Sequence, residues 1–128
     1  MIIDTTFVID LLRNNPQAIK KAYEIEENNL PILLTTITIF ELWQGIETNS
    51  KEKEEKIKNF LERVSILTLD LEGAKIAGTI YKELEIKGQR IDAEDSMIAG
   101  IVLSRNETLL TRNIKHFERI KGLKAETY

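Results

Sequence analysis

The chain has 128 residues, of which 42% are hydrophobic and 30% charged, and its formal net charge is −3. This balance predicts one globular domain over residues 1–128, and it argues against a disordered chain and against a broad basic surface for nucleic acid. The absence of cysteine excludes disulfides and thiolate metal sites, and no apolar run or basic leader indicates a membrane span or a signal peptide, so we expect a cytoplasmic protein.

The first half of the chain alternates short apolar runs with amphipathic segments. In chain order we expect a buried strand at 1–4, helices at 6–15 and 16–29, and a second buried strand at 30–36. The first helix would begin with Thr6, whose hydroxyl suits a cap. Residues 36–47 are ambiguous, and we favour a helix that starts near Thr36 or Thr38 and carries Glu41 in its first or second turn.

The second half continues the alternation. We expect a helix at 50–64, a strand at 65–70, helices at 70–88 and 93–106, a strand at 108–111, a helical turn at 113–120 and a final strand at 123–127. The small residues Ala99 and Gly100 indicate a place where another element packs closely. Strands that alternate with helices predict right-handed crossovers and a parallel sheet covered on both faces, so the fold class is α/β.

Several oxygen-bearing side chains fall where such a sheet binds ligands, outside the carboxyl ends of its strands. Asp4 ends the first strand, and Thr111 and Asn113 follow the strand at 108–111. Asp95 lies in the first turn of its helix, and Glu41 interrupts an apolar run where a solvated charge is hard to explain. We therefore expect these side chains to converge at one edge of the sheet.

Each of these residues also has a purely structural interpretation. Asp4 is a leading type of helix cap, and Asp95 favours the positive end of its helix whatever else it does. Glu41 is explained equally by an arginine partner or by exposure, and Thr111 and Asn113 by an ordinary turn. The combination is more informative than its parts. Oxygen ligands without cysteine or a histidine pair suit Mg²⁺ or Mn²⁺, which can polarise a phosphodiester and generate a nucleophile from water.

Four stretches of the chain resemble, in order, the motifs of the PIN-domain ribonucleases of the VapC toxin type. These stretches are "IIDTTFVIDLL", "TTITIFELWQG", "GQRIDAEDSMIAG" and "LLTRNIKHFERIKGLKAETY". Any one of them is a weak signal, but four in the right order over essentially the whole chain make a strong one. The resemblance implies an α/β/α sandwich around a central, mainly parallel sheet of four or five strands.

The resemblance also implies an activity, which is the Mg²⁺- or Mn²⁺-dependent hydrolysis of phosphodiester bonds in RNA. It assigns metal binding to Asp4, Asp95 and Glu41, and it adds Asn113 as the fourth catalytic position. The family often has aspartate at that fourth position, so Asn113 puts a tightly held second metal in doubt. A neutral amide can still orient a metal-bound water or a phosphate.

Other residues near the motifs are candidates for supporting roles. Thr6 and Thr111 match hydroxyl positions that would donate to the carboxylates. Asp92 lies three residues before Asp95 and could lean toward the same site, although a solvated turn explains it as well. Arg112 is a candidate contact for substrate phosphates, although an ordinary solvated charge explains it too. The only histidine, His116, is interpreted as a packing or hydrogen-bonding residue rather than a general base.

The resemblance implies two protein partners. Family members act as homodimers, and a cognate antitoxin silences them by placing its tail in a groove near the active site. The sequence itself offers only apolar residues beyond the expected core, such as Phe40, Trp43, Phe60 and Tyr81.

Two alternative functions follow from the residues. A catalytically weak or silent binding module that keeps the fold is possible because Asn113 is neutral. A phosphatase or receiver domain with Asp4 as phospho-acceptor is disfavoured because "DTT" lacks an aspartate two residues later, and because no lysine directly follows "TLLT".

Overall fold

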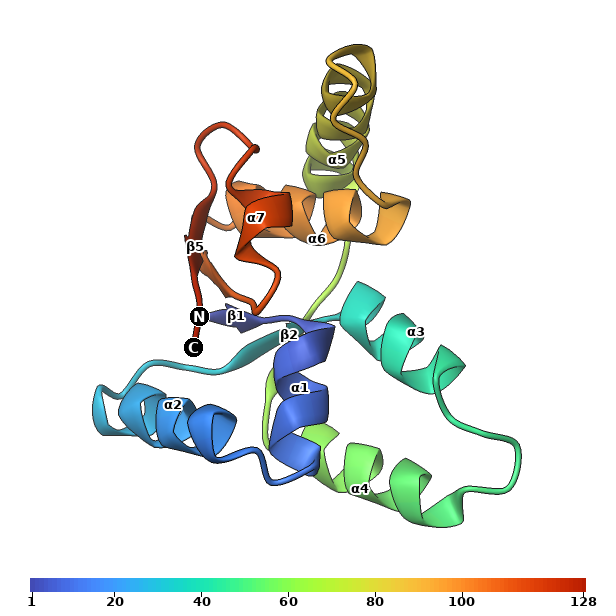
Figure 1. Ribbon diagram of the computed structural model, residues 1–128, viewed down its shortest axis with the longest axis vertical. Coiled ribbons are helices and arrows are strands. Elements are labelled where there is room, and N and C mark those ends of the chain that lie inside the picture. The colour runs from blue at the N-terminus through green and yellow to red at the C-terminus, as the bar shows by residue number, and fades with distance from the viewer.

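The computed structural model describes all residues, 1–128, and its centre is a five-stranded sheet (Figure 1). The strands are β1 (Ile2–Ile3), β2 (Leu33–Thr35), β3 (Ser65–Leu67), β4 (Thr108–Leu110) and β5 (Lys124–Glu126). The helices are α1 (Thr5–Leu12), α2 (Pro16–Glu27), α3 (Thr36–Gln44), α4 (Lys51–Leu61), α5 (Leu71–Ile86), α6 (Ala93–Ser104) and α7 (Ile114–Phe117). No helix combines the length and the apolar character that a membrane span requires.

The sheet is parallel throughout, with the strand order β3-β2-β1-β4-β5. β1 occupies the centre, where Ile2 pairs with Leu33 on one side and Leu109 on the other. The predicted α/β class, with a mainly parallel sheet of four or five strands, is confirmed. Because all strands run the same way, their carboxyl ends gather the segments that follow β1, β2 and β4 at one edge.

Side chains alternate along each strand and build one core on each face of the sheet. Ile2 and Leu109 belong to a core that α5, α6 and α7 cover, whereas Ile3 and Leu110 belong to a core under α1, α2 and α4. The two groups of helices lie on opposite sides of the strands (Figure 1). The period of two residues therefore places buried apolar side chains on both faces, which explains why consecutive apolar residues occur in the inner strands β1, β2 and β4.

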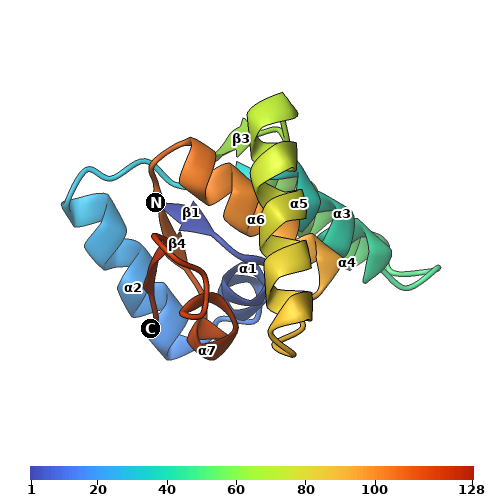
Figure 2. The ribbon, with the colours of Figure 1, turned by 90° about the horizontal axis from the view of Figure 1, so that it is seen from above.

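Helix α6 is packed backbone to backbone against α5, which crosses it in Figure 2. A Cβ atom on Gly100 would lie 2.3 Å from the carbonyl oxygen of Gly73 and 2.9 Å from the Cβ of Ala77. Only glycine allows this approach, so the predicted close packing at Ala99 and Gly100 is confirmed. The contact fixes the position of α6, whose first turn lies at the carboxyl edge of the sheet.

One capping prediction is wrong. Thr6 was expected to cap the first helix, but α1 begins at Thr5 and Asp4 is its N-cap. Asp4 Oδ1 accepts the backbone N–H of Phe7 at 3.0 Å and the Thr6 hydroxyl at 2.7 Å. A carboxylate that accepts from both groups satisfies an orphan donor of the helix, so Thr6 donates to the cap instead of forming it.

Candidate active site

Asp4 is the most enclosed carboxylate of the candidate site, with only 5% of the residue exposed. Besides Phe7 and Thr6, it contacts Thr111, whose hydroxyl donates to Asp4 Oδ2. Burial raises the pKa of Asp4, and the hydrogen bonds from Thr111, Thr6 and Phe7 oppose that rise because they favour the charged form. Asp4 is therefore a desolvated carboxylate that neighbouring donors hold in one orientation.

Glu41 reaches the same region from α3. The ambiguous segment is helical from Thr36, and the Thr35 hydroxyl caps it by accepting the N–H of Thr38 at 3.1 Å. The Thr5 hydroxyl donates to Glu41 Oε1 at 2.9 Å, so the starts of α1 and α3 are joined through this carboxylate. Burial raises the pKa of Glu41, the Thr5 hydrogen bond opposes that rise, and the charges of Asp95, Glu94 and Asp4 add to it.

Asp95 projects from the first turn of α6. Burial, followed by the charge of Asp92, raises its pKa to about 6, while His116 opposes the rise and Asp4 and Glu94 add to it. The charge of Asp4 acts on Asp95, and the charges of Asp4 and Asp95 both act on Glu41, so the three predicted carboxylates form one electrostatic cluster. These three carboxylates thus lie near one another at the carboxyl edge of the sheet.

The cluster lacks a basic counter-charge. No lysine or arginine forms an ion pair with Asp4, Glu41 or Asp95, and the nearest cationic candidate is His116, whose Nδ1 lies 3.9 Å from Asp95 Oδ2. No three acidic or histidine side chains are placed to hold one metal ion together in this conformation. Magnesium typically takes one or two protein carboxylates and completes its shell with water and phosphate oxygens, so this open, unneutralised group of oxygens fits a hard divalent cation.

The predicted residues Asn113 and Asp92 lie at the exposed rim of the candidate site. Thr111 Oγ1 accepts the backbone N–H of Asn113 at 3.0 Å, which ties the segment after β4 to Asp4 through Thr111. The Asn113 side chain makes no capping bond to α7 and is exposed. Asp92 is exposed at the start of α6 and makes no capping bond either. Its charge acts on Asp95, so it lies near the site without entering it.

His116 differs from the prediction. Its side chain is 56% exposed and faces Asp95 across 3.9 Å, so it is not a packing residue. The short helix α7 explains the difference, because Phe117, 1% exposed, fills the core position of that turn and leaves its neighbour at the surface.

Two kinds of residue near the site were not predicted from the sequence, namely a hydroxyl that orients Glu41 and the partners of Arg112. Thr5 orients Glu41, and its only signal was its place between Asp4 and Thr6. Arg112, predicted near the phosphates, is in an ion pair with Asp10 and lies over the ring of Tyr128. Asp10 follows Thr6 by four residues on one helix, and this spacing could have marked Asp10 as a neighbour of the site. No sequence pattern marks Tyr128 as a partner of Arg112.

Comparison with known proteins identifies the family of the chain. Residues 1–123 match the PIN domain family. The chain belongs to that family. Ribonuclease VapC2 of Rickettsia felis is 32% identical over 99% of this chain and 96% of its own, and Ribonuclease VapC1 of Methanocaldococcus jannaschii is 33% identical over 100% and 86%. The tRNA(fMet)-specific endonuclease VapC of Salmonella typhimurium is 30% identical over 99% and 96%.

Solved structures agree with this assignment. VapBC2 from Rickettsia felis, bound to a DNA fragment from its promoter, superposes with a TM-score of 0.89 at 28% identity and covers 99% of this chain and 97% of that chain. DNA-bound VapBC from Salmonella typhimurium gives 0.86 at 29% identity, over 98% and 96%. The predicted membership of the PIN-domain ribonucleases of the VapC type is confirmed, with a PIN-like α/β/α fold.

The raised pKa of Asp95 predicts that its charge destabilises the metal-free PIN domain. Asp95→Asn is expected to increase the free energy of unfolding by about 1 kcal/mol at pH 7.5, a value reduced because 21% of the side chain is exposed. The folded pKa of about 6 exceeds the reference value of 3.8, so the gain is full above pH 6, shrinks as the pH falls, and vanishes below 3.8.

Urea unfolding in EDTA at pH 7.5 and pH 3.5 measures this difference. Glu26→Gln, which changes an exposed glutamate on α2, is the matched control and is expected to have little effect at either pH. An Asp95→Asn variant that is less stable than the parent at pH 7.5 would contradict the electrostatic account of the site.

Proposed function

We propose that this PIN-domain protein is a Mg²⁺- or Mn²⁺-dependent endoribonuclease that hydrolyses phosphodiester bonds in RNA, and that it is the toxin of a VapBC-type toxin–antitoxin pair. The observation that carries the proposal is the cluster of Asp4, Glu41 and Asp95 at the carboxyl edge of the sheet, without a basic partner. Full-length relatives named ribonucleases support the reaction class. The proposal places the protein in the cytoplasm, with its RNA substrate.

In this proposal Asp4, Glu41 and Asp95 hold the metal. The bound ion would supply positive charge for the phosphoryl group and a water activated for attack. The protein's own contribution is orientation, because Thr111 and Thr6 fix the carboxylate of Asp4 and Thr5 fixes that of Glu41.

Asn113 and Asp92 complete the proposed site from its rim. The exposed amide of Asn113 can donate to a phosphate and accept from a water, which suits a catalytic position without a charge. Asp92 adds negative potential beside Asp95 and so favours the approach of a cation.

Removing a metal-binding carboxylate is expected to abolish cleavage. Asp4→Asn and Asp95→Asn should each lower the RNA cleavage rate by more than about 100-fold. Mutation of residues that only hydrogen-bond to metal ligands already lowers metal affinity or activity by about 10- to 100-fold. The measurement is cleavage of a labelled RNA with Mg²⁺ or Mn²⁺, and EDTA should stop the parent enzyme. Glu26→Gln is the control, since that residue is exposed on α2.

The same proteins test the silent binding module. Calorimetric titration of the parent with Mn²⁺ should show binding that Asp95→Asn weakens. If the parent neither binds Mn²⁺ nor cleaves RNA, the nuclease proposal fails and the binding module, which the neutral Asn113 allows, takes its place. Cleavage by Asp95→Asn at the parent rate would refute the site assignment alone.

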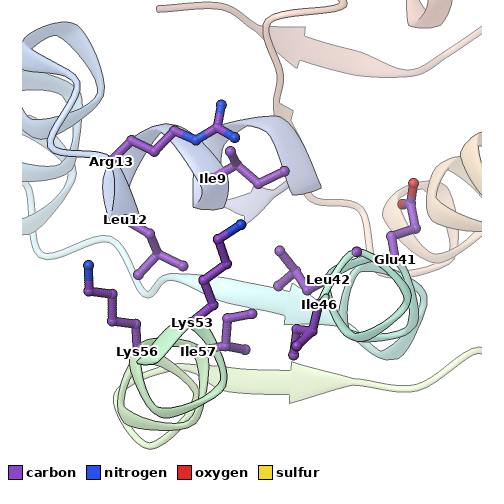
Figure 3. Close-up of a pocket in the computed structure, with 10 residues that line it drawn as sticks. Ile9, Leu12, Arg13, Glu41, Leu42, Ile46, Lys53, Lys56 and Ile57 are labelled. Atoms are coloured by element: carbon purple, nitrogen blue, oxygen red, sulfur yellow. The ribbon is translucent and has the colours of Figure 1, made fainter. Parts of the chain in front are cut away.

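A groove beside the site offers a place for the proposed antitoxin. It has a volume of about 210 Å³ between α1, α3 and α4, and Glu41 stands at its α3 end (Figure 3). Its apolar lining consists of Ile9, Leu12, Leu42, Ile46 and Ile57. Figure 3 shows Lys53 reaching from α4 toward α1 across the groove. The solved VapBC structures support a partner of this kind.

The lining defines the chemistry of the expected segment. Its apolar residues would cover the floor of the groove, and acidic residues would face Arg13, Lys53 and Lys56 at the rim. Because Glu41 is also part of the lining, a segment seated here would lie against the candidate metal site. We therefore propose an antitoxin with an amphipathic acidic segment that blocks RNA access.

A negative charge in the groove should expel such a segment. Ile46→Asp is expected to weaken binding of the product of the adjacent reading frame by about tenfold or more, because it buries an unpaired charge that also repels acidic residues. Calorimetry measures the affinity, and RNA cleavage by the variant alone should persist. Leu71→Asp is the control because Leu71, 74% exposed, begins α5 on the opposite face of the sheet. Equal affinity of both variants would exclude the groove.

Exposed aromatic side chains support the proposed homodimer. Phe40 and Trp43 lie three residues apart on α3 and are 54% and 44% exposed, and Tyr81 on α5 is 41% exposed. Aromatic residues are enriched in protein interfaces, and side chains three residues apart share one face of a helix. Phe60, grouped with them from the sequence, instead packs against the core under α1, α2 and α4.

A charge on this face of α3 should weaken self-association. Trp43→Glu is expected to shift the sedimentation equilibrium from dimer toward monomer, because it would bury an unpaired charge in the interface. Tyr23→Glu is the control, since Tyr23 is 63% exposed on α2. Unchanged sedimentation of Trp43→Glu relative to this control would place the interface elsewhere.

A further inference from the structure

Three side chains from distant parts of the chain meet beside the acidic cluster. Asp10 Oδ2 accepts the hydroxyl of Tyr128 at 2.5 Å and lies 2.5 Å from Nη2 of Arg112. The guanidinium carbon of Arg112 stands 5.6 Å from the centre of the Tyr128 ring. We call these three residues the arginine clamp, because Asp10 and Tyr128 hold the guanidinium from its edge and from its face.

The inner part of the clamp is packed against the core. The Tyr128 ring packs edge-on against the buried Phe7 at a centroid distance of 4.8 Å, and Asp10 is only 13% exposed. Burial and the hydrogen bond to Asp10 raise the pKa of Tyr128 above its ordinary value, so its hydroxyl stays protonated and remains a donor. Arg112 therefore rests on two groups that the packing keeps in place.

The clamp is built onto the residues that orient Asp4. Arg112 lies between Thr111, whose hydroxyl donates to Asp4, and Asn113, whose N–H donates to Thr111. On α1, Asp10 follows Thr6 by four residues, and the Thr6 hydroxyl donates to Asp4 Oδ1 at 2.7 Å. The guanidinium is thus fixed relative to the metal-binding carboxylates from both sides.

Most of the hydrogen-bond donors of Arg112 remain available to a ligand. A guanidinium carries five N–H donors in a planar fork, and only Nη2 contacts Asp10 while 49% of the side chain stays exposed. We infer that Asp10 and Tyr128 are positioning residues that hold Arg112 so that its remaining donors bind an RNA phosphate beside the cleaved bond. This inference rests on the proposed ribonuclease function and adds a specific route for recognition of the substrate backbone.

A clamp that only stabilised the fold would not need the half-exposed guanidinium of Arg112. Asp10 and Tyr128 already join α1 to the C-terminal segment through their own hydrogen bond, and a half-exposed ion pair adds little stability. The surrounding carboxylates repel an RNA backbone, so a fixed cation at the rim has a clear electrostatic use. A guanidinium also matches the geometry of a phosphate better than an ammonium does.

Binding of a labelled single-stranded RNA in EDTA tests the clamp without cleavage. Arg112→Ala is expected to weaken binding about tenfold and to reduce the slope of log K against log salt by about 0.7, the value for one phosphate contact on a single strand. Arg112→Lys should restore the slope but only part of the affinity. Arg105→Ala is the control, since Arg105 is 44% exposed in an ion pair with Asp70 at the other end of α6 from Asp95.

A double-mutant cycle tests the positioning role. Tyr128→Phe keeps the ring but removes the hydroxyl, and it is expected to weaken RNA binding about threefold in the parent and hardly at all in Arg112→Ala. In Mg²⁺-dependent cleavage the same variant should raise KM with kcat little changed, because the contact is present in the ground state. Tyr23→Phe on α2 is the matched control.

The inference is overturned by no RNA binding by the parent, by an unchanged salt slope in Arg112→Ala, or by an equal effect of Tyr128→Phe with and without Arg112. Loss of thermal stability in Arg112→Ala with unaltered RNA binding is the signature of a structural clamp and also refutes it. Failure of the nuclease proposal is distinct, because a parent that binds RNA with the expected slope but does not cleave it contradicts hydrolysis and leaves the clamp in place.

Discussion

The buried carboxylate of Asp4 is the interaction on which the site depends. One side chain caps α1 through the N–H of Phe7 and accepts the hydroxyl of Thr111 at the end of β4, while its own backbone N–H donates to the Leu110 carbonyl at 3.1 Å. The cap of α1 and the contact with the end of β4 therefore depend on the same carboxylate. The segments that carry the other functional residues are placed relative to this carboxylate, so the geometry of the site follows from the way β1 ends.

Concentrating acids at this edge costs stability, and the fold compensates elsewhere. Burial raises the pKa of Asp4, Glu41 and Asp95, which means that each charge is less favourable in the folded protein than in water. The compensation is apolar packing on both faces of the sheet and the backbone contact of α6 at Gly100. The close packing of α6 against α5 holds Asp95 near the like charges of Asp92 and Asp4.

The sequence predicted the elements well because the apolar runs and the cap residues agree along most of the chain. Even the ambiguous segment at Thr36 is helical, since Thr35 provides a cap that ends β2 at once. The prediction failed where two possible hydrogen-bond acceptors compete for the cap. Thr6 and Asp4 both suit a cap, and only the three-dimensional position of Thr111 explains why the carboxylate takes that place and the hydroxyl supports it. Long-range partners such as Tyr128 leave no periodic signal, so the clamp on Arg112 could not be predicted.

The repulsion among these carboxylates gives a physical reason for the neutral side chain of Asn113. An aspartate at the same position would bring a further negative charge to a group in which Asp95 already has a pKa of about 6. Because like charges nearby make each ionisation less favourable, the neutral amide limits the cost to the metal-free fold. In the proposed metal site the same choice would give up one anionic ligand and would increase the importance of oxygen atoms from the substrate. If Arg112 holds the RNA backbone at the rim, substrate binding and completion of the metal shell become coupled, and a site with few protein ligands can still act on RNA.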